Sequence, residues 1–305
     1  EQNLGLLVGQ DQVKQLLTKS LLAGNCSAYL LVGPPHIGKG FLSRIMAASL
    51  HQEINVFRVH PDTIAFDDIL QKNLDEDGEK QWKDSVVEFI HLIYLSPVSS
   101  SVKIGIIENI DRFSVKAMNA LLKTLEEPPA RAMLILTAQE ISNVLPTIIS
   151  RTQMVRLHYL SDVEIEQYVK NYTTEQVSEI VMLTNGAVGT ASQLINQPKL
   201  LAKALAGLSN FQALMHKDIF SMIQMSNIKD RDEAITLLQL WLNLTRRTLI
   251  SKLGGETNNL LTELLPKYSV ADLIKLIDRL KLAISAIEAN ANIRVTLEST
   301  ALSVV

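Results

Sequence analysis

The chain has 305 residues, of which 47% are hydrophobic and 20% are charged, and its formal net charge is −3. Such a composition can bury a substantial core and argues against disorder. The charge argues against a chain that coats DNA by itself, because phosphate affinity depends on clustered Lys and Arg. No run of about 18 apolar residues is present, which argues against an ordinary membrane span.

The sequence contains a single cysteine, Cys26. An internal disulfide and a cysteine-built zinc site are therefore excluded. The segment Glu1–Gly9 has no basic stretch followed by an apolar core, so we expect no secretory signal there. These features together predict a cytoplasmic protein.

The first 160 residues alternate short apolar runs with helix-like segments, which is typical of a parallel sheet covered by helices. The expected strands are, in chain order, Ala28–Val32, Val56–Val59, Val102–Ile107, Ala132–Thr137 and Met154–Leu157. Between the third and fourth strands, apolar residues recur at helical spacing from Met118 to Leu125. Ser114 is placed to cap that helix, and Pro128-Pro129 to end it.

Beyond residue 160 the strand-like runs disappear, and the long segments show helical periodicity. We predict an α/β domain over residues 1–160, a small helical lid over 161–198 and an all-helical domain over 199–305. In the last of these, Arg246-Arg247 follows Trp241, a combination more typical of a solvated helix edge than of a DNA contact.

The segment from Gly33 to Gly40, Gly-Pro-Pro-His-Ile-Gly-Lys-Gly, follows the first strand and opens a helix. This is the setting of a phosphate-binding loop, in which backbone N–H groups surround phosphate oxygens and a lysine reaches the terminal ones. Gly33, Gly38, Lys39 and Gly40 are thus candidate nucleotide ligands. The pattern asks for Ser or Thr at position 40 to bind Mg²⁺, so the loop either keeps ATP or ADP without efficient hydrolysis or binds nothing.

The second half of such a site is an apolar strand that ends in acidic residues. Here Ile104–Ile107 is followed by Glu108-Asn109-Ile110-Asp111. Glu108 could hold a metal, but Asn109 stands where related ATPases carry the Glu that activates water. An amide cannot accept a proton from water at neutral pH. Two separate defects therefore affect the same reaction, and the pattern indicates a degenerate ATP site.

A more specific signal is the stretch from Asn119 to Pro129, Asn-Ala-Leu-Leu-Lys-Thr-Leu-Glu-Glu-Pro-Pro. It closely resembles a signature of bacterial clamp-loader subunits, which are AAA+ proteins. Thr137 follows in the sensor-1 position, and Ser150-Arg151-Thr152 is similar to the Ser-Arg-Cys motif of the family. Within the signature, Lys123, Glu126 and Glu127 either face a partner or form a solvated polar face. Shorter motifs resemble the delta-prime subunits in particular: His60-Pro61-Asp62, Asn185–Gly189 and Asn292–Glu298.

This resemblance implies an α/β AAA+ domain with a degenerate phosphate loop, a helical lid and a C-terminal collar for oligomerisation. It also implies that Arg151 acts in trans as an arginine finger on the ATP of a neighbouring subunit. The chain departs from the family at Thr152, which replaces a cysteine, and at Thr190, where active members carry the sensor-2 arginine. The cysteines of a zinc module are missing between Ala48 and Val59, so we expect no zinc or other metal site.

The predicted function is that of a non-hydrolysing, delta-prime-like subunit of the bacterial DNA polymerase III clamp loader. Its expected partners are the other subunits of a pentameric ring and, through the ring, a sliding clamp and primed DNA. No cofactor is required, although ATP or ADP could occupy the loop beside Glu108 and Thr137. The alternatives are an active AAA+ motor with an atypical metal site at Glu108, and a module that holds ATP or ADP as a structural cofactor.

Overall fold

The computed structural model describes residues 3–23, 27–72, 78–216, 228, 230–255 and 268–302. Cys26 lies outside this part of the chain. The chain divides by contacts into two units, Glu1–Leu160 with Ala187–Gly189, and Ser161–Gly186 with Thr190–Val305. The division into three domains, with boundaries after residues 160 and 198, stays a prediction.

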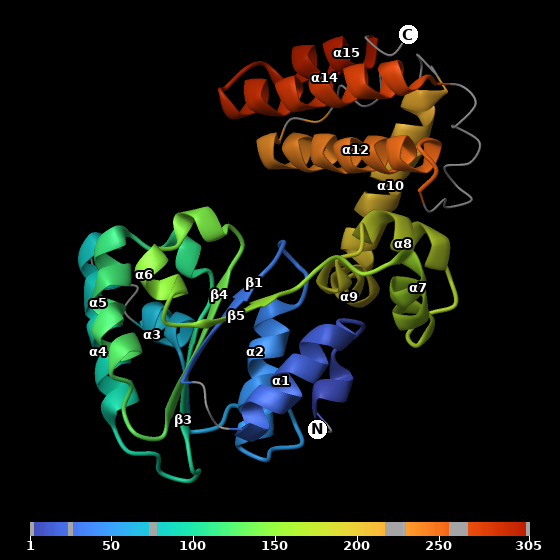
Figure 1. The fold of residues 1–305 in the computed structure, drawn as a ribbon. Coiled ribbons are helices and arrows are strands. Elements are labelled where there is room, and N and C mark those ends of the chain that lie inside the picture. The colour runs from blue at the N-terminus through green and yellow to red at the C-terminus, as the bar shows by residue number, and fades with distance from the viewer. Residues whose placement is uncertain are drawn as a thin grey trace. The chain divides into compact units, whose positions relative to one another are not determined.

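A five-stranded parallel sheet forms the centre of the first unit (Figure 1), with the strand order β2-β3-β4-β1-β5. The strands are β1 (Ala28–Val32), β2 (Thr63–Ala65), β3 (Lys103–Ile107), β4 (Ala132–Ala138) and β5 (Gln153–Arg156). Strand β1 lies between β4 and β5, with Leu30 opposite both Leu136 and Met154. Four of the expected strands are confirmed to within about a residue at each end.

The strand expected at Val56–Val59 is wrong, because this segment forms a turn. The side chain of Asn55 accepts a hydrogen bond from the N–H of Phe57, and its carbonyl accepts one from Arg58. Asn side chains stabilise such turns by bonding to backbone groups two residues on. The local turn prevails over the apolar pattern, which leaves Phe57 and Val59 exposed. The edge strand is instead β2.

Helices cover both faces of the sheet (Figure 1). The helices of this unit are α1 (Asp11–Ala23), α2 (Lys39–Leu50), α3 (Phe66–Lys72), α4 (Gly78–Tyr94), α5 (Val115–Glu126) and α6 (Pro146–Ile149), with short 3-10 turns at Asn3–Leu6, Ile110–Arg112 and Ile141–Asn143. Leu31 of β1 joins a core with α1 and α2. Its neighbour Leu30 joins a separate core with α3, α4 and α5. Successive strand residues point to opposite faces, which explains why β1 is apolar throughout.

Helix α5 begins and ends as the sequence predicts. The Ser114 side chain accepts a hydrogen bond from the N–H of Ala117, which caps the helix. Met118, Leu121 and Leu125 are buried in the core beneath the sheet. The helix ends at Glu126, just before the two prolines. These contacts fix the position of the carboxyl end of α5, which is important for the site described below.

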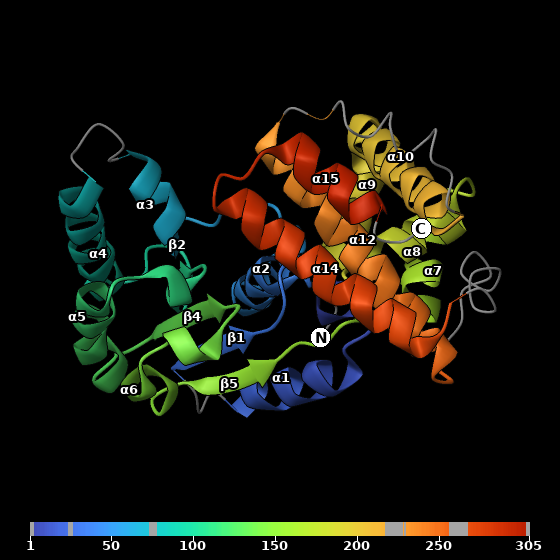
Figure 2. The ribbon, with the colours of Figure 1, turned by 90° about the horizontal axis from the view of Figure 1, so that it is seen from above.

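The second unit is helical over its described residues. Its helices are α7 (Asp162–Lys170), α8 (Val177–Thr184), α9 (Val188–Asn196, shared with the first unit), α10 (Pro198–Met215), α12 (Arg231–Lys252), α14 (Val270–Glu288) and α15 (Ile293–Leu302). Helices α12, α14 and α15 lie side by side in Figures 1 and 2. Trp241 is buried among them and donates its indole N–H to the carbonyl of Gly207 at 3.2 Å. Arg247 forms an ion pair with Asp162. Trp241 and Arg247 therefore both have partners within the second unit.

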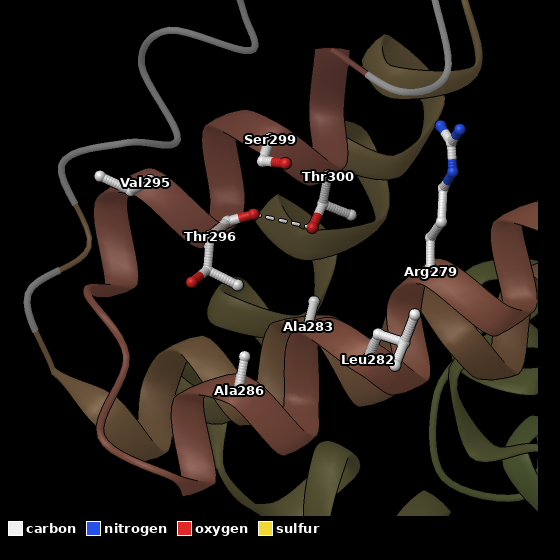
Figure 3. Close-up of a pocket in the computed structure, with 8 residues that line it drawn as sticks. All are labelled: Arg279, Leu282, Ala283, Ala286, Val295, Thr296, Ser299 and Thr300. Atoms are coloured by element: carbon white, nitrogen blue, oxygen red, sulfur yellow. Dashed lines mark hydrogen bonds between the residues drawn. The ribbon is translucent and has the colours of Figure 1, made fainter.

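A groove of about 530 Å³ runs between α14 and α15 (Figure 3). Its wall includes the exposed apolar side chains of Leu282 and Val295. A hydrogen bond of 2.8 Å from the hydroxyl of Thr300 to the carbonyl of Thr296 lies within α15, beside the groove.

No helix among the described residues is both long and apolar enough to cross a membrane.

The packing of α4 on the sheet predicts that Gly105→Ala is destabilising. A Cβ on Gly105 would lie 2.6 to 2.8 Å from side-chain atoms of Ile93, Phe89 and Leu134. All three side chains are buried, so we expect overpacking to lower the free energy of unfolding by about 1–3 kcal/mol. Urea unfolding measures this loss. Gly5→Ala is the matched control, since nothing lies within 4 Å of a Cβ there; equal stability of the two variants would contradict the prediction.

Candidate functional site

The phosphate-type loop forms between β1 and α2, as its sequence predicts. Gly33 is required by packing, because a Cβ there would lie 2.8 Å from the carbonyl oxygen of Leu157. Gly38 has φ +99°, a left-handed conformation that favours glycine. The N–H of Gly189 donates to the carbonyl of His36 at 2.8 Å within the same unit. The loop is therefore a tight strand-to-helix turn that requires glycine at positions 33 and 38 and is held by a backbone hydrogen bond from Gly189.

Lys39 is buried and hydrogen-bonded to the loop itself. Its Nζ donates to the carbonyl oxygens of Gly33 at 2.6 Å and Pro34 at 2.7 Å. Burial lowers the pKa of Lys39, whereas the nearby carboxylates of Asp111 and Glu108 act in the opposite direction. The ammonium thus satisfies carbonyls of its own chain. A phosphate would have to replace these contacts to reach it.

Glu108 lies directly over Gly40. A Cβ at position 40 would lie 2.7 Å from Oε1 and 3.0 Å from Oε2 of Glu108. Burial raises the pKa of Glu108, and Asp67 raises it further, whereas Arg44 and Lys39 lower it. The sequence indicated that Glu108 could hold a metal and that Gly40 lacks the hydroxyl of the pattern, and the structure brings these two positions into contact.

These residues do not fit the Mg²⁺ ion of a P-loop ATPase. Such an ion needs a hydroxyl after the lysine, and here the carboxylate of Glu108 occupies the space beside a glycine. Among the described residues, no group of three or more His, Cys, Asp or Glu side chains is arranged to hold a metal ion. The site keeps Lys39 and the acidic residue Glu108 but lacks the hydroxyl that would join Glu108 in holding Mg²⁺.

The contact between Gly40 and Glu108 predicts that substitutions at the two positions are coupled. Gly40→Ser should destabilise the chain by less than about 1 kcal/mol, because only the end of the Glu108 side chain must move. Glu108→Asp shortens the side chain and should restore much of this loss. Thermal unfolding of both single variants and the double variant measures a coupling of at least about 0.5 kcal/mol.

Gly40→Ala is the control for this cycle. The same coupling with alanine would assign the effect to the Cβ and not to the hydroxyl. Additive effects of Gly40→Ser and Glu108→Asp would contradict the geometry.

Thr137 joins the ends of β3 and β4. It is buried, and its hydroxyl accepts a hydrogen bond of 3.0 Å from the N–H of Asn109. The Asn109 side-chain oxygen accepts one from Gln139 at 3.3 Å. Asp111 accepts from the N–H groups of Gln139 and Glu140 through Oδ2, while its buried Oδ1 has no hydrogen-bond partner. Thr137 therefore fixes the segment that holds Asn109.

Arg151 lies on a different part of the unit, just after α6. Its Nη2 forms an ion pair with Glu126 at 2.7 Å. Its Nη1 donates to the carbonyl of Thr147 at 2.9 Å and to the hydroxyl of Ser150 at 3.3 Å. The side chain is 34% exposed. These partners belong to α5, α6 and the turn after α6, and none of them is a residue of the phosphate loop.

Asp62 of the His-Pro-Asp motif is a buried anchor that the sequence analysis did not identify. Its Oδ1 accepts from the N–H of Val98, and its Oδ2 from those of Ser99 and Ser100, at 2.7 to 2.9 Å. Burial raises the pKa of Asp62, but the backbone hydrogen bonds outweigh it and lower the pKa to about 2. The ionised carboxylate thus holds the loop before β3.

Two histidines stack beside this anchor. The rings of His51 and His60 have centroids 3.8 Å apart and are inclined by 13°. Burial lowers the pKa of His51 to about 4, and His60 contributes to the shift. The Nε2 atom of His51 lies 2.8 Å from the hydroxyl of Thr63. The motif therefore ties the edge strand β2 to the loop that precedes β3.

Asp62→Asn tests the stability that this anchor provides. The pKa is about 2 in the folded chain against 3.8 for an ordinary aspartate, so the folded state favours the ionised form. The resulting stabilisation, about 2 kcal/mol, is present above pH 3.8 and is lost as the pH falls toward 2. Urea unfolding between pH 2 and 7 should show the stability gap between wild type and Asp62→Asn narrowing below pH 3.8 and closing toward pH 2. Asp11→Asn is the control, because the Asp11 side chain is 81% exposed. If the difference in free energy of unfolding between wild type and Asp62→Asn does not change with pH, Asp62 is not the ionised anchor described above.

A protein-family comparison matches residues 9–161 to the family described as DNA polymerase III, delta subunit. This segment covers β1, the phosphate loop, the signature helix and Arg151. It is thus the part of the chain that carries both candidate sites.

Curated relatives extend the likeness. A DNA polymerase III subunit gamma of Buchnera aphidicola subsp. Schizaphis graminum (strain Sg) is 26% identical over 283 residues, which cover 87% of this chain and 76% of the relative. A subunit tau of Bacillus subtilis (strain 168) is 31% identical over 154 residues, which cover 48% of this chain and 27% of the relative. The sequence from Asn119 to Pro129 resembles a signature found in proteins of this kind.

Among solved structures, a DNA polymerase III gamma subunit-related protein of Thermotoga maritima matches with a TM-score of 0.58 and 20% identity. The match covers 95% of this chain and 97% of that chain. At this identity the likeness concerns the fold. Together with the parallel sheet and the helical second unit, it confirms the predicted class, α/β plus all-α of the AAA+ type.

Proposed function

The chain belongs to the DNA polymerase III delta subunit family of clamp-loader proteins, and on this premise we propose that it is a non-hydrolysing, delta-prime-like subunit. In this proposal it supplies Arg151 to the ATP site of a neighbouring subunit while a sliding clamp is loaded onto primed DNA. Its own phosphate loop has a structural role. The observation that carries the proposal is the contrast between Lys39, which is bonded to its own loop, and the partly exposed Arg151 in the same unit.

The loop supports this proposal because several features oppose hydrolysis there. Gly40 supplies no hydroxyl for Mg²⁺, Asn109 cannot act as a base, and Lys39 is bonded to loop carbonyls. We propose that neither a nucleotide nor a metal is required in this chain. The motor alternative needs a metal at Glu108, and the missing hydroxyl at Gly40 counts against it.

Arg151 supports the proposal by its chemistry and its exposure. A guanidinium stays charged at all working pH values and makes planar, forked contacts that Lys does not reproduce. In the best-studied enzymes, an arginine supplied in trans accelerates phosphoryl transfer by about 10³–10⁵. With 34% of its side chain exposed, Arg151 is accessible to a ligand carried by another subunit.

We further propose that the partners of the chain are the other subunits of a pentameric ring. The helices after residue 198 would then form its part of a collar, and the clamp and primed DNA would be contacted by the assembled loader. The family assignment and the curated relatives named above support this reading. A cytoplasmic site of action follows from the same proposal.

The proposal predicts that Arg151→Ala slows the reconstituted loader. With the clamp and primed DNA present, we expect ATP turnover at the neighbouring site to fall at least about tenfold, because one transition-state charge contact is lost. Arg151→Lys should recover little of it. Steady-state and single-turnover ATPase assays measure the change, and Arg156→Ala, at another exposed arginine of the same unit, is the matched control.

The isolated chain should be inert in the same assay. If Arg151→Ala assembles normally and turns over like wild type, the finger assignment is wrong. If the isolated chain hydrolyses ATP and Lys39→Ala abolishes this activity, the motor reading replaces the proposal.

A further inference from the structure

The guanidinium of Arg151 is held at both terminal nitrogens by its own chain. Nη2 pairs with Glu126 at 2.7 Å, and Nη1 donates to Thr147 and Ser150. We call these three partners the Arg151 bracket. They come from the end of α5, from α6 and from the turn that follows it, so the bracket joins two helices separated by the 19 residues 127–145.

The number of N–H donors on the guanidinium shows how many remain outside the Arg151 bracket. A guanidinium has five N–H donors, and the Arg151 bracket uses three of them. Two remain for a ligand while the plane of the group stays fixed. A long side chain that is already ordered loses less conformational entropy when it binds. The bracket is therefore suited to presenting the arginine rather than to burying it.

Both sides of the bracket are rigid. Glu126 is the last residue of α5, whose inner face is buried through Leu121 and Leu125. On the other side, Ile148 anchors α6 in the same core. The position of the Glu126 carboxylate is thus set by the packing of the helix, and the proline pair after it prevents the helix from continuing.

We propose that Glu126 is the positioning residue for Arg151, holding the guanidinium in the orientation in which it meets the phosphate of a neighbouring ATP. This inference rests on the proposed function and deepens it. Glu126 itself does not touch the nucleotide, and it acts through the arginine. The adjacent Glu127 is exposed and has no part in the bracket.

Glu126→Gln tests this role in the reconstituted loader with its clamp and primed DNA. An exposed ion pair contributes little free energy, so the expected effect is a fall of about two- to fivefold in kcat at the neighbouring site. The KM for ATP should stay unchanged, because Glu126 positions a group for the reaction and does not bind the substrate. In the Arg151→Ala background the same substitution should have no further effect.

Glu127→Gln is the matched control, since it removes the same charge one residue away. It should behave like wild type. A thermal melt of each isolated chain establishes that the variants fold. As a readout independent of the ring, modification of Arg151 by phenylglyoxal, followed by mass spectrometry, should be several-fold faster in Glu126→Gln than in wild type or Glu127→Gln.

The outcomes separate the two proposals. If Arg151→Ala leaves turnover unchanged, the proposed function fails first. If Arg151→Ala slows the ring but Glu126→Gln equals wild type, equals Glu127→Gln or raises kcat, the positioning role is overturned while the finger stands. A change in the KM for ATP alone also overturns it.

Discussion

The placement of one carboxylate determines how the phosphate loop of this chain can be used. Glu108 lies where a side chain at position 40 would have to be, 2.7 Å from the Cβ that glycine lacks. A P-loop ATPase needs a hydroxyl and a metal ion in that region. Because the hydroxyl and the acidic residue hold the same ion, their positions must lie close together, and Glu108 is placed accordingly. The departure at this contact is the glycine, which supplies no hydroxyl, and the backbone of the loop is preserved around it.

The same unit carries a second cationic group in the opposite situation. Arg151 lies at the junction of α5 and α6, where the end of a buried helix provides a carboxylate and a short helix provides a carbonyl. Those elements pack on the core shared with α3 and α4, whereas α2, after the loop, packs on the core of the other face. The sheet separates the two cores, so the loop and Arg151 are supported by different sets of core residues.

Local rules predicted much of the fold, and their failures have physical causes. The cap at Ser114, the buried face of α5 and four strands follow from turn chemistry and periodicity. The strand expected at Val56–Val59 failed because an Asn55 turn prevailed over an apolar pattern. The candidate residues of the loop were identified by motif, but the contact of Glu108 with Gly40 depends on the pairing of β3, β4 and β1 and could not be read from spacing. The pairing of Glu126 with Arg151 joins distant segments in the same way, and only the signature around Glu126 hinted at it.

Lys39 and Arg151 differ in how deeply they are buried and in how many of their hydrogen-bond donors are already used. Lys39 is surrounded by its own loop, which lowers its pKa and occupies its donors with carbonyls. A phosphate approaching it must displace those contacts. Arg151 has two donors outside the bracket and a side chain that is 34% exposed. Electrostatic stabilisation of a reaction requires a charge that is oriented beforehand and still accessible to the reacting group. Of the two cations, Arg151 is both oriented by its own chain and exposed, which is the arrangement that the proposed role in trans requires.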